Sequence, residues 1–282
     1  LSGKRCGHEF MRMKPVQALR HFLLALQFFT RIPVTGRLAD WVGYSPAMLR
    51  ASAGHFPGVG WVVGAAAALV LAAGLRWLPP GPLGALVAAG LATAATVWLT
   101  GAFHEDGLAD TADGLGGGVT RERALQIMKD SRIGSYGTVT LVLALGLKVA
   151  LTALLAQRGA GAAAAAVLGA HVLSRAAPLD VMRRLPYVGE ADGSKAKPLA
   201  DSISPGGIAT GIAWSLPALL LLAWALGGWS LLAAGVLWVL ALAYMRRLLA
   251  RRLQGFTGDT LGATQQVCEL ALLLGLALAA SP

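Results

Sequence analysis

Long apolar runs alternate with short polar segments along the whole chain. The runs are rich in Ala, Leu, Val and Gly, and they reach the roughly 20 residues that a helix needs to cross a bilayer. The pattern predicts an all-α, polytopic integral membrane protein with seven spans. The predicted spans cover residues 54–75, 81–101, 134–156, 160–178, 207–226, 229–247 and 262–280.

The segment before the first span has a different pattern. Between residues 15 and 32, apolar positions recur at helical spacing among polar ones. We expect an amphipathic helix that is too polar to span and lies along the membrane interface. Pro33 ends it, because proline disfavours a helical conformation in the residue before it. The chain therefore divides into a basic tail, residues 1–15, and a single helical membrane domain, residues 16–282.

Composition and charge agree with a membrane protein and predict its orientation. Charged residues make up 13% of the chain and hydrophobic residues 56%, whereas soluble domains hold roughly 25% charged residues. The net charge is +10. With the N-terminus inside, only Arg76 and Arg158 lie in outer loops, while the inner loops are strongly basic. The positive-inside rule therefore predicts a cytoplasmic N-terminus. Such basic segments suit anionic membrane lipid, and no basic patch interleaved with aromatic residues indicates nucleic-acid binding.

The polar segment at residues 101–118 is the main candidate for chemistry. It holds Glu105, Asp106, Asp110 and Asp113 within nine residues. In a helix the three aspartates share an arc of ~60°, and the glutamate lies ~100° away from it. Three carboxylates on one face repel one another unless a cation lies between them. Mg²⁺ is a hard divalent ion that takes oxygen ligands, so we expect these four acids to hold it.

A simpler interpretation of these acids is a solvated face, or a set of charges that favours a helix N-terminus. No Lys or Arg stands between Glu105 and Asp113 to pair with them, whereas a solvated face normally mixes both charges. The metal site is therefore the better interpretation. We expect the glycines at positions 114 and 116–118 to end the helix.

Two further polar segments lie on the same predicted side of the membrane. The segment at 128–137 contains Lys129 and Arg132, which suit phosphate oxygens; a basic anchor beside the membrane is the alternative. The segment at 255–269 contains Asp259, a candidate metal ligand or base. Acids for a metal, basic groups and glycine backbones on one side together predict a site that handles a diphosphate.

Charged residues inside the predicted spans are costly in lipid and therefore suggest function. Arg175 is a candidate partner for a phosphate or carboxylate, whereas we interpret His171 as a packing histidine. Lys148 either pairs with Glu269 or extends to the interface, and the sequence does not decide between them. The loop at residues 179–206 suits a lid over a charged substrate or an ordinary solvated loop.

Four stretches resemble cobalamin-5′-phosphate synthase, the adenosylcobinamide-GDP ribazoletransferase family. They are LQFFTRIPV at residues 26–34, FHEDGLADTADG at 103–114, MKDSRIGSYG at 128–137 and GFTGDTLGA at 255–263. The resemblance implies a multi-pass protein of the bacterial inner membrane with a cytoplasmic active site. It also implies a Mg²⁺-dependent reaction between a corrinoid, adenosylcobinamide-GDP, and a nucleoside, α-ribazole or its 5′-phosphate. The products are adenosylcobalamin or its 5′-phosphate and GMP, by transfer of phosphocobinamide onto the ribazole 3′-hydroxyl.

The residues that match the family motifs, together with Arg175 of the fourth predicted span, receive the following roles. The predicted metal ligands are Glu105, Asp106, Asp110 and Asp113. The predicted catalytic residues are Asp106 and Asp110, with Asp130 or His104 taking the proton of the ribazole hydroxyl. The predicted substrate-binding residues are Lys129, Ser131, Arg132, Arg175 and Asp259.

Other classes of protein fit the sequence less well. CDP-alcohol phosphotransferases expect Asp-Gly followed two residues later by Ala-Arg, whereas Leu108, Ala109 and Asp110 follow here. Intramembrane prenyltransferases need two Asp-rich motifs, and Asp259 stands alone. A corrinoid transporter with alternating access would show internal repeats and a site at the midplane. The oligomeric state, a homo-oligomer included, is left open by the sequence.

Overall fold

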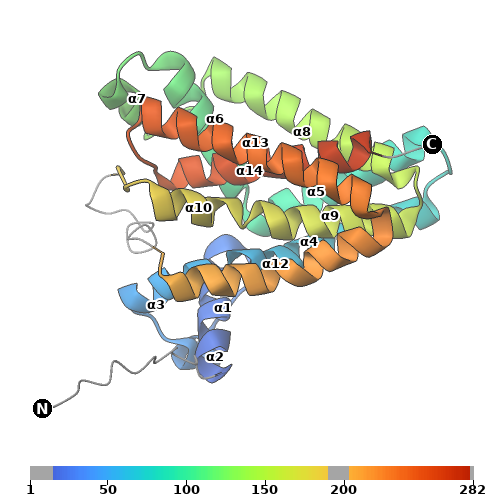
Figure 1. Ribbon diagram of the computed structural model, residues 1–282, viewed down its shortest axis with the longest axis horizontal. Coiled ribbons are helices and arrows are strands. Elements are labelled where there is room, and N and C mark those ends of the chain that lie inside the picture. Colours follow the sequence, from blue (N-terminus) through green and yellow to red (C-terminus); the bar gives the residue numbers. More distant parts are fainter. Residues whose placement is uncertain (1–14, 190–202, 280–282) are drawn as a thin grey trace, which may run out of the picture.

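The computed structural model describes residues 15–189 and 203–279 (Figure 1). Within these ranges every regular element is a helix, and one isolated β-bridge joins Tyr187 to Phe256. The predicted basic tail lies outside them except for its last residue. The elements are α1 (Pro15–Phe29), α2 (Gly36–Val42), α3 (Pro46–Ser52), η1 (Ala53–His55), α4 (Phe56–Trp77), α5 (Pro82–Thr100), α6 (Phe103–Gly117), α7 (Arg121–Ile127), α8 (Ser135–Ala156), α9 (Ala160–Ser174), α10 (Ala177–Arg184), α12 (Pro205–Leu226), α13 (Gly228–Arg252) and α14 (Gly258–Leu278).

The prediction of seven membrane spans is confirmed. Seven helical segments are long and apolar enough to cross a bilayer: Pro46–Trp77, Pro82–Thr100, Ser135–Ala156, Ala160–Arg184, Pro205–Leu226, Gly228–Arg252 and Gly258–Leu278. The first segment starts earlier than predicted, because α3 and η1 lead into α4 without a break. The fourth extends through α10, so the predicted loop at 179–206 starts as helix. Residues 190–202, nearly half of that predicted lid or solvated loop, lie outside the described residues.

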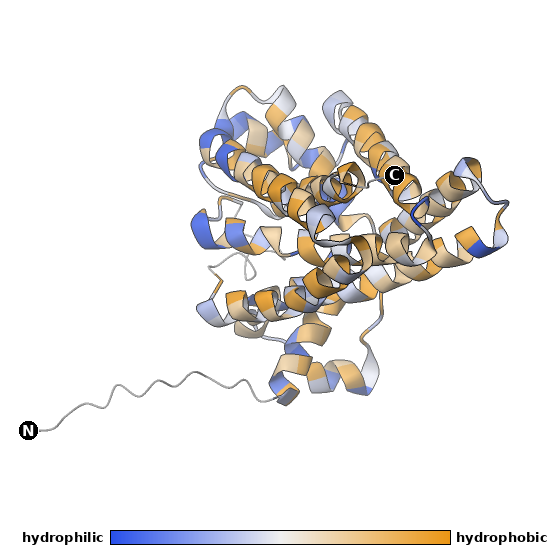
Figure 2. Ribbon diagram, turned by 45° about the vertical axis from the view of Figure 1, so that its right-hand side comes forward, coloured by the Kyte–Doolittle hydropathy of each residue, from blue (hydrophilic) through white to orange (hydrophobic). Residues whose placement is uncertain are grey.

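Helices α9 and α14 form the centre of the bundle. In the spans that contain them, 78% and 67% of the 18-residue apolar stretch is buried inside the protein. The corresponding share is 22% in α12 and in α13. Helix α14 packs against α13, α6, α9 and α8, and α9 packs against α4 and α12. Most hydrophilic segments gather near the end of the bundle that holds α6, α7 and α10 (Figure 2). Polar side chains of α9 and α14 therefore face protein rather than lipid.

The amphipathic helix predicted before the first span is α1. It runs across the direction of the spans (Figure 1) and contacts α2, α3 and α4. Leu24 and Phe29 are buried, whereas Val16 and Leu19 are exposed. The Arg20 guanidinium donates to the Val42 carbonyl oxygen at 2.9 Å, which ties α2 to α1. The helix therefore closes one side of the bundle without crossing it.

Helix α6 is the acidic segment, and a sharp break separates it from α5. Gly101 and Ala102 both have left-handed backbone conformations, with φ of 65° and 60°, which is a common way to end a helix. The expectation that the glycines at positions 114 and 116–118 end this helix is confirmed, since α6 ends at Gly117 and Gly118 is its C-cap. Its C-terminal carbonyls at Leu115 and Gly118 accept hydrogen bonds from Arg252 of α13, which stabilises the glycine-rich end.

Candidate active site

Helices α6 and α14 approach closely where Gly107 faces Asp259. A Cβ added to Gly107 would lie 2.6 Å from the Asp259 carbonyl oxygen and 3.0 Å from its Cα, so this contact requires glycine. Thr257 and Thr260 cap the start of α14, each accepting a hydrogen bond from the other's backbone N–H at 3.3 and 2.9 Å. The acids of α6 therefore meet a fixed helix start that carries Asp259.

A carboxylate cluster, defined here as Asp106, Asp110 and Asp259, lies at this contact. Asp106 is exposed, and Asp110 and Asp259 are half-buried. Burial raises the pKa of Asp110 to about 7, helped by the negative charges of Asp106, Asp259 and Asp113. The sequence placed Asp259 far from the α6 acids, and the fold brings it into their electrostatic field.

The carboxylate cluster suits a hard cation by its chemistry. Its donors are all carboxylate oxygens, and their mutual repulsion is the kind that a divalent cation relieves. Across residues 15–189 and 203–279, no three His, Cys, Asp or Glu side chains are already arranged to hold a metal ion. The side chains would have to draw together around one. Mg²⁺ and its ligands therefore stay predictions.

Asp113 has a role that the sequence analysis did not assign to it. Its Oδ2 accepts the Gly134 N–H at 2.7 Å and its Oδ1 accepts the Gly137 N–H at 2.8 Å. These donors belong to the start of α8, and the carboxylate is buried. Asp113 therefore joins α6 to the segment at 128–137, and both of its oxygens already have partners.

Glu105 points away from the aspartates, as its helical position predicts. The side chain is buried, and its Oε1 accepts a hydrogen bond from Gln266 of α14 at 2.9 Å. Its Oε2 has no hydrogen-bond partner among the described residues. Its role as a metal ligand stays a prediction. Its side chain lies in the interior of the bundle, whereas that of Asp106 is exposed.

The segment at 128–137 presents its charged side chains to solvent. Arg132 forms an ion pair with Asp130 at 2.6 Å, and its backbone N–H also donates to the same carboxylate. These bonds lower the pKa of Asp130 to about 2. Lys129 precedes this pair and Ser131 lies between its two members, and both are exposed. The exposed pair leaves the Arg132 guanidinium accessible to a phosphate.

A buried polar network connects α8, α9 and α14 deeper in the bundle. Lys148 Nζ lies 2.7 Å from Glu269 Oε1, which decides the alternative in favour of pairing. His171 Nδ1 lies 3.5 Å from the same oxygen. Arg175 donates to the His171 carbonyl oxygen at 2.8 Å, and Gln265 donates to Glu269 Oε2 at 2.7 Å. His171 is thus part of a charged network, more than the packing histidine predicted.

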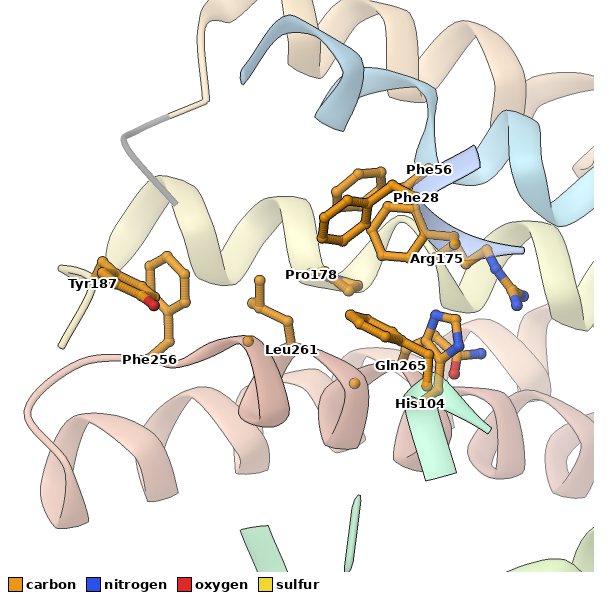
Figure 3. Close-up of a pocket in the computed structure, with 13 residues that line it drawn as sticks. Phe28, Phe56, His104, Arg175, Pro178, Tyr187, Phe256, Leu261 and Gln265 are labelled. Atoms are coloured by element: carbon orange, nitrogen blue, oxygen red, sulfur yellow. The ribbon is translucent and has the colours of Figure 1, made fainter. Parts of the chain in front are cut away.

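An aromatic pocket lies between α1, α4, α6, α10 and α14 (Figure 3). Its cavity volume is about 40 Å³, within a larger hollow of about 570 Å³ that includes open solvent. Its lining residues are Phe28, Phe29, Phe56, Phe103, His104, Arg175, Pro178, Tyr187, Phe256, Gly258, Leu261, Gly262 and Gln265. Arg175, His104 and Gln265 lie together at one end, and Tyr187 and Phe256 lie at the other (Figure 3).

His104 belongs to this pocket rather than to the carboxylate cluster. Its ring stacks against Phe29 with centroids 5.9 Å apart. Burial lowers its pKa well below the ordinary value, so the imidazole is neutral near pH 7. The sequence analysis missed the pocket because its phenylalanines come from four separate segments. The available signal was the presence of aromatic residues at 28–29 and 103 inside two of the four family motifs.

Comparison with known proteins identifies the family of the chain. A family model described as cobalamin-5-phosphate synthase matches residues 21–277. An adenosylcobinamide-GDP ribazoletransferase from Polaromonas naphthalenivorans is 58% identical over 274 residues, which covers 93% of this chain and 99% of that protein. Proteins of the same name from Leptothrix cholodnii and Vibrio cholerae are 52% and 41% identical, over 92% and 91% of this chain and 96% and 92% of their own lengths. No solved structure gives a significant match.

The matched residues include the starts of α6 and α14, which carry the carboxylate cluster. They also include the segment at 128–137 and the lining of the aromatic pocket. The family resemblance predicted from four short motifs is therefore confirmed over nearly the whole length of the chain, and the chain belongs to the cobalamin-5-phosphate synthase family.

Proposed function

We propose that this chain transfers phosphocobinamide from adenosylcobinamide-GDP to α-ribazole or its 5′-phosphate. The oxygen of the acceptor 3′-hydroxyl forms a bond to the phosphorus that carries cobinamide. The phosphoanhydride bond to GMP breaks, GMP leaves with the bonding electrons, and the hydroxyl proton passes to a base. The names of relatives that share up to 58% of their residues with this chain support this reaction.

The observation that carries the proposal is the meeting of Asp106, Asp110 and Asp259 at the Gly107 contact. Two carboxylates come from α6 and one from α14. Burial, together with the neighbouring negative charges, raises the pKa of Asp110 to about 7. Such a concentration of negative charge is unfavourable unless a cation is part of the working site. Diphosphate transfer requires that cation.

We assign the cation, Mg²⁺, to Asp106, Asp110 and Asp259. When bound, it would neutralise charge on the diphosphate and on the departing GMP. Asp113 is the less suitable ligand of the α6 acids, because backbone N–H groups occupy both of its oxygens. Its work in the proposed site is to fix the segment at 128–137 against α6.

We assign the phosphate oxygens of the donor to Lys129, Ser131 and Arg132. Asp113 holds this segment beside the carboxylate cluster through Gly134 and Gly137. Arg132 and Asp130 are both exposed, with 87% and 39% of their side-chain surfaces accessible. A phosphate can therefore replace Asp130 as the partner of the guanidinium.

The two predicted proton acceptors differ in their suitability. Asp130 is ionised, but Arg132 holds its pKa at about 2, so it is a weak base. His104 is neutral and therefore has a ring nitrogen without a proton, but it lies in the aromatic pocket. Comparing the activity of His104→Gln with that of Asp130→Asn tests the assignment, because only loss of the proton acceptor flattens the pH dependence of kcat.

We place the chain in the bacterial inner membrane with this site on the cytoplasmic side. The basic ends of α10 and α13 share the end of the bundle that holds α6 and α7 (Figure 1), and the positive-inside rule assigns such an end to the cytoplasm. Labelling of single cysteines in intact cells tests the orientation. A cysteine at Val119 should be protected from an impermeant thiol reagent, and one at Gly81 should be labelled.

The decisive experiment follows GMP release from adenosylcobinamide-GDP by the purified protein in lipid vesicles. Release that depends on added α-ribazole and on Mg²⁺ supports the proposal. Release without α-ribazole would contradict it. Ribazole-independent uptake of the corrinoid into vesicles would favour the transporter that the sequence left as an alternative.

A further inference from the structure

The aromatic pocket and the carboxylate cluster are both built on the starts of helices α6 and α14. Phe103 and His104 line the pocket, and Asp106 follows within the same turn of α6. On the other side Gly258 lines the pocket and immediately precedes Asp259. A ligand in the pocket is therefore a direct neighbour of any group that reacts at the carboxylates.

Three parts of the site follow one another along α6. The pocket residues come first, at 103 and 104, and the carboxylates Asp106 and Asp110 come next. Asp113 then holds the backbone of the proposed phosphate-binding segment. At about 1.5 Å per residue, the pocket and this anchor are separated by roughly 15 Å. Since phosphoryl transfer places the attacking and leaving oxygens roughly in line, acceptor and leaving nucleotide belong at opposite ends of this row.

The lining of the pocket is suited to a flat, weakly polar ring system. Phe28, Phe29 and Phe103 pack edge to face, with centroids 4.9 to 5.7 Å apart. Tyr187 and Phe256 make a similar pair at 5.6 Å. Such walls favour aromatic ligands through stacking and edge-to-face contacts.

The deep end of the pocket holds polar atoms that the fold leaves unpaired. Arg175 Nε and Gln265 Oε1 are buried and have no hydrogen-bond partner among the described residues. The two side chains are 4% and 0% exposed. A buried donor without a partner is costly, and a ring nitrogen that accepts a hydrogen bond from Arg175 would relieve that cost.

We propose that the aromatic pocket binds the heterocyclic base of the acceptor nucleoside, a benzimidazole, and directs its ribose toward the carboxylate cluster. This inference rests on the proposed function. It assigns the acceptor to the end of α6 that faces α1 and α4, away from the segment at 128–137 where the donor phosphates bind. The unsubstituted ring nitrogen of the benzimidazole accepts from Arg175.

The guanine base of the donor suits this pocket less well. Guanine presents several donors and acceptors along its edges, whereas the polar side chains of the pocket are Arg175, His104 and Gln265 at one end and Tyr187 at the other. Burying guanine here would leave most of its polar groups without partners. A benzimidazole has one such acceptor and an otherwise apolar surface, so it loses little on burial.

The test fills the pocket and measures the two substrates separately. Leu261 lines the pocket from α14, and Leu261→Trp would occupy its space. The matched control is Leu220→Trp, since Leu220 of α12 is 72% exposed on the outer surface of the bundle. Phe103→Leu is the second variant, because Phe103 lines the pocket yet is 38% exposed and tolerates change. Full-length protein in nanodiscs is used, and size-exclusion profiles verify folding.

We expect Leu261→Trp to raise the KM for α-ribazole at least tenfold while the KM for adenosylcobinamide-GDP changes less than twofold. Phe103→Leu should give the same selectivity with a smaller rise, and Leu220→Trp should behave as wild type. An increased KM for the donor alone, or unchanged KM values in both pocket variants, would overturn the inference.

Equilibrium binding of α-ribazole without donor separates this inference from the proposed function. Wild type should bind α-ribazole, and Leu261→Trp should lose that binding. If wild type releases GMP normally and Leu261→Trp still binds α-ribazole, the pocket assignment alone is overturned. A wild type that binds α-ribazole in the pocket but releases no GMP would overturn the reaction instead.

Discussion

Lys148 of α8 and Glu269 of α14 form an ion pair of 2.7 Å in the interior of the bundle, where both side chains are at most 5% exposed. Each charge would be unfavourable alone at this depth. Gln265 binds the second oxygen of Glu269, and Gln265 also lines the aromatic pocket. The pair therefore links the packing of α8 and α14 to the walls of the proposed acceptor site.

Removing one member of this pair should destabilise the protein more than removing both. Lys148→Met leaves the buried Glu269 carboxylate without the cation that lies 2.7 Å away, which costs up to about 3 to 5 kcal/mol. The double variant Lys148→Met with Glu269→Gln removes both charges and should recover most of that loss. Thermal unfolding in detergent measures Lys148→Met, Glu269→Gln and the double variant. Equal or additive losses in the double variant would contradict the coupling.

Asp106→Asn or Asp110→Asn should abolish turnover at every Mg²⁺ concentration while the protein remains folded. Asp106 is exposed and Asp110 half-buried, so each amide fits in place of the carboxylate. The loss comes from the missing negative charge that holds the cation. GMP release measured over a Mg²⁺ titration checks this. Near-normal activity in either variant would rule out the metal assignment.

Asp113→Asn should fail in a different way. An asparagine has only one acceptor oxygen, so one of the two N–H groups at Gly134 and Gly137 would lose its partner, at a cost of about 1 to 3 kcal/mol. We expect a lower unfolding temperature and a raised KM for adenosylcobinamide-GDP. The Mg²⁺ concentration at half-maximal activity should stay near that of wild type. A large rise in that concentration would make Asp113 a ligand after all.

The pattern of the sequence was sufficient for the spans but not for the contacts between them. Hydropathy depends only on local composition, so it was enough to locate all seven spans. Most of the predicted span ends lie within a few residues of the ends in the structure. The helix end was also predicted correctly, since the glycine run at 114–118 ends α6 at Gly117. A Cβ on Gly114 would lie 2.4 Å from Met128 Cγ. This close packing against the segment around α7 depends on the fold, so hydropathy could not show it.

The candidate site shows the same division. Helical spacing correctly separated Glu105 from the three aspartates, because position around a helix follows from residue number. It did not reveal that Asp113 binds the start of α8, since that partner is 21 to 24 residues away. The meeting of Asp259 with α6 likewise depends on a close helix contact at Gly107. Motif resemblance put these residues in one site without showing how they touch.

Metal binding should weaken as the pH falls through 7. The pKa of Asp110 is raised to about 7 in the absence of metal, so protons and a divalent cation compete for its carboxylate. Above pH 7 the group is ionised and binds the cation; below pH 7 it is protonated and must first release its proton. The apparent Kd should therefore rise about tenfold between pH 8 and pH 6.

Mn²⁺ binding followed by electron paramagnetic resonance measures this shift, because Mn²⁺ takes the same oxygen ligands as Mg²⁺. Glu122→Gln is the matched control, since Glu122 is an exposed carboxylate of α7 outside the cluster. It should keep the wild-type Kd at both pH values. Asp110→Asn should bind Mn²⁺ weakly at both and lose most of the pH dependence, because the group that titrates is gone. Equal Kd values for wild type at pH 6 and pH 8 would show that Asp110 does not take part in binding the cation.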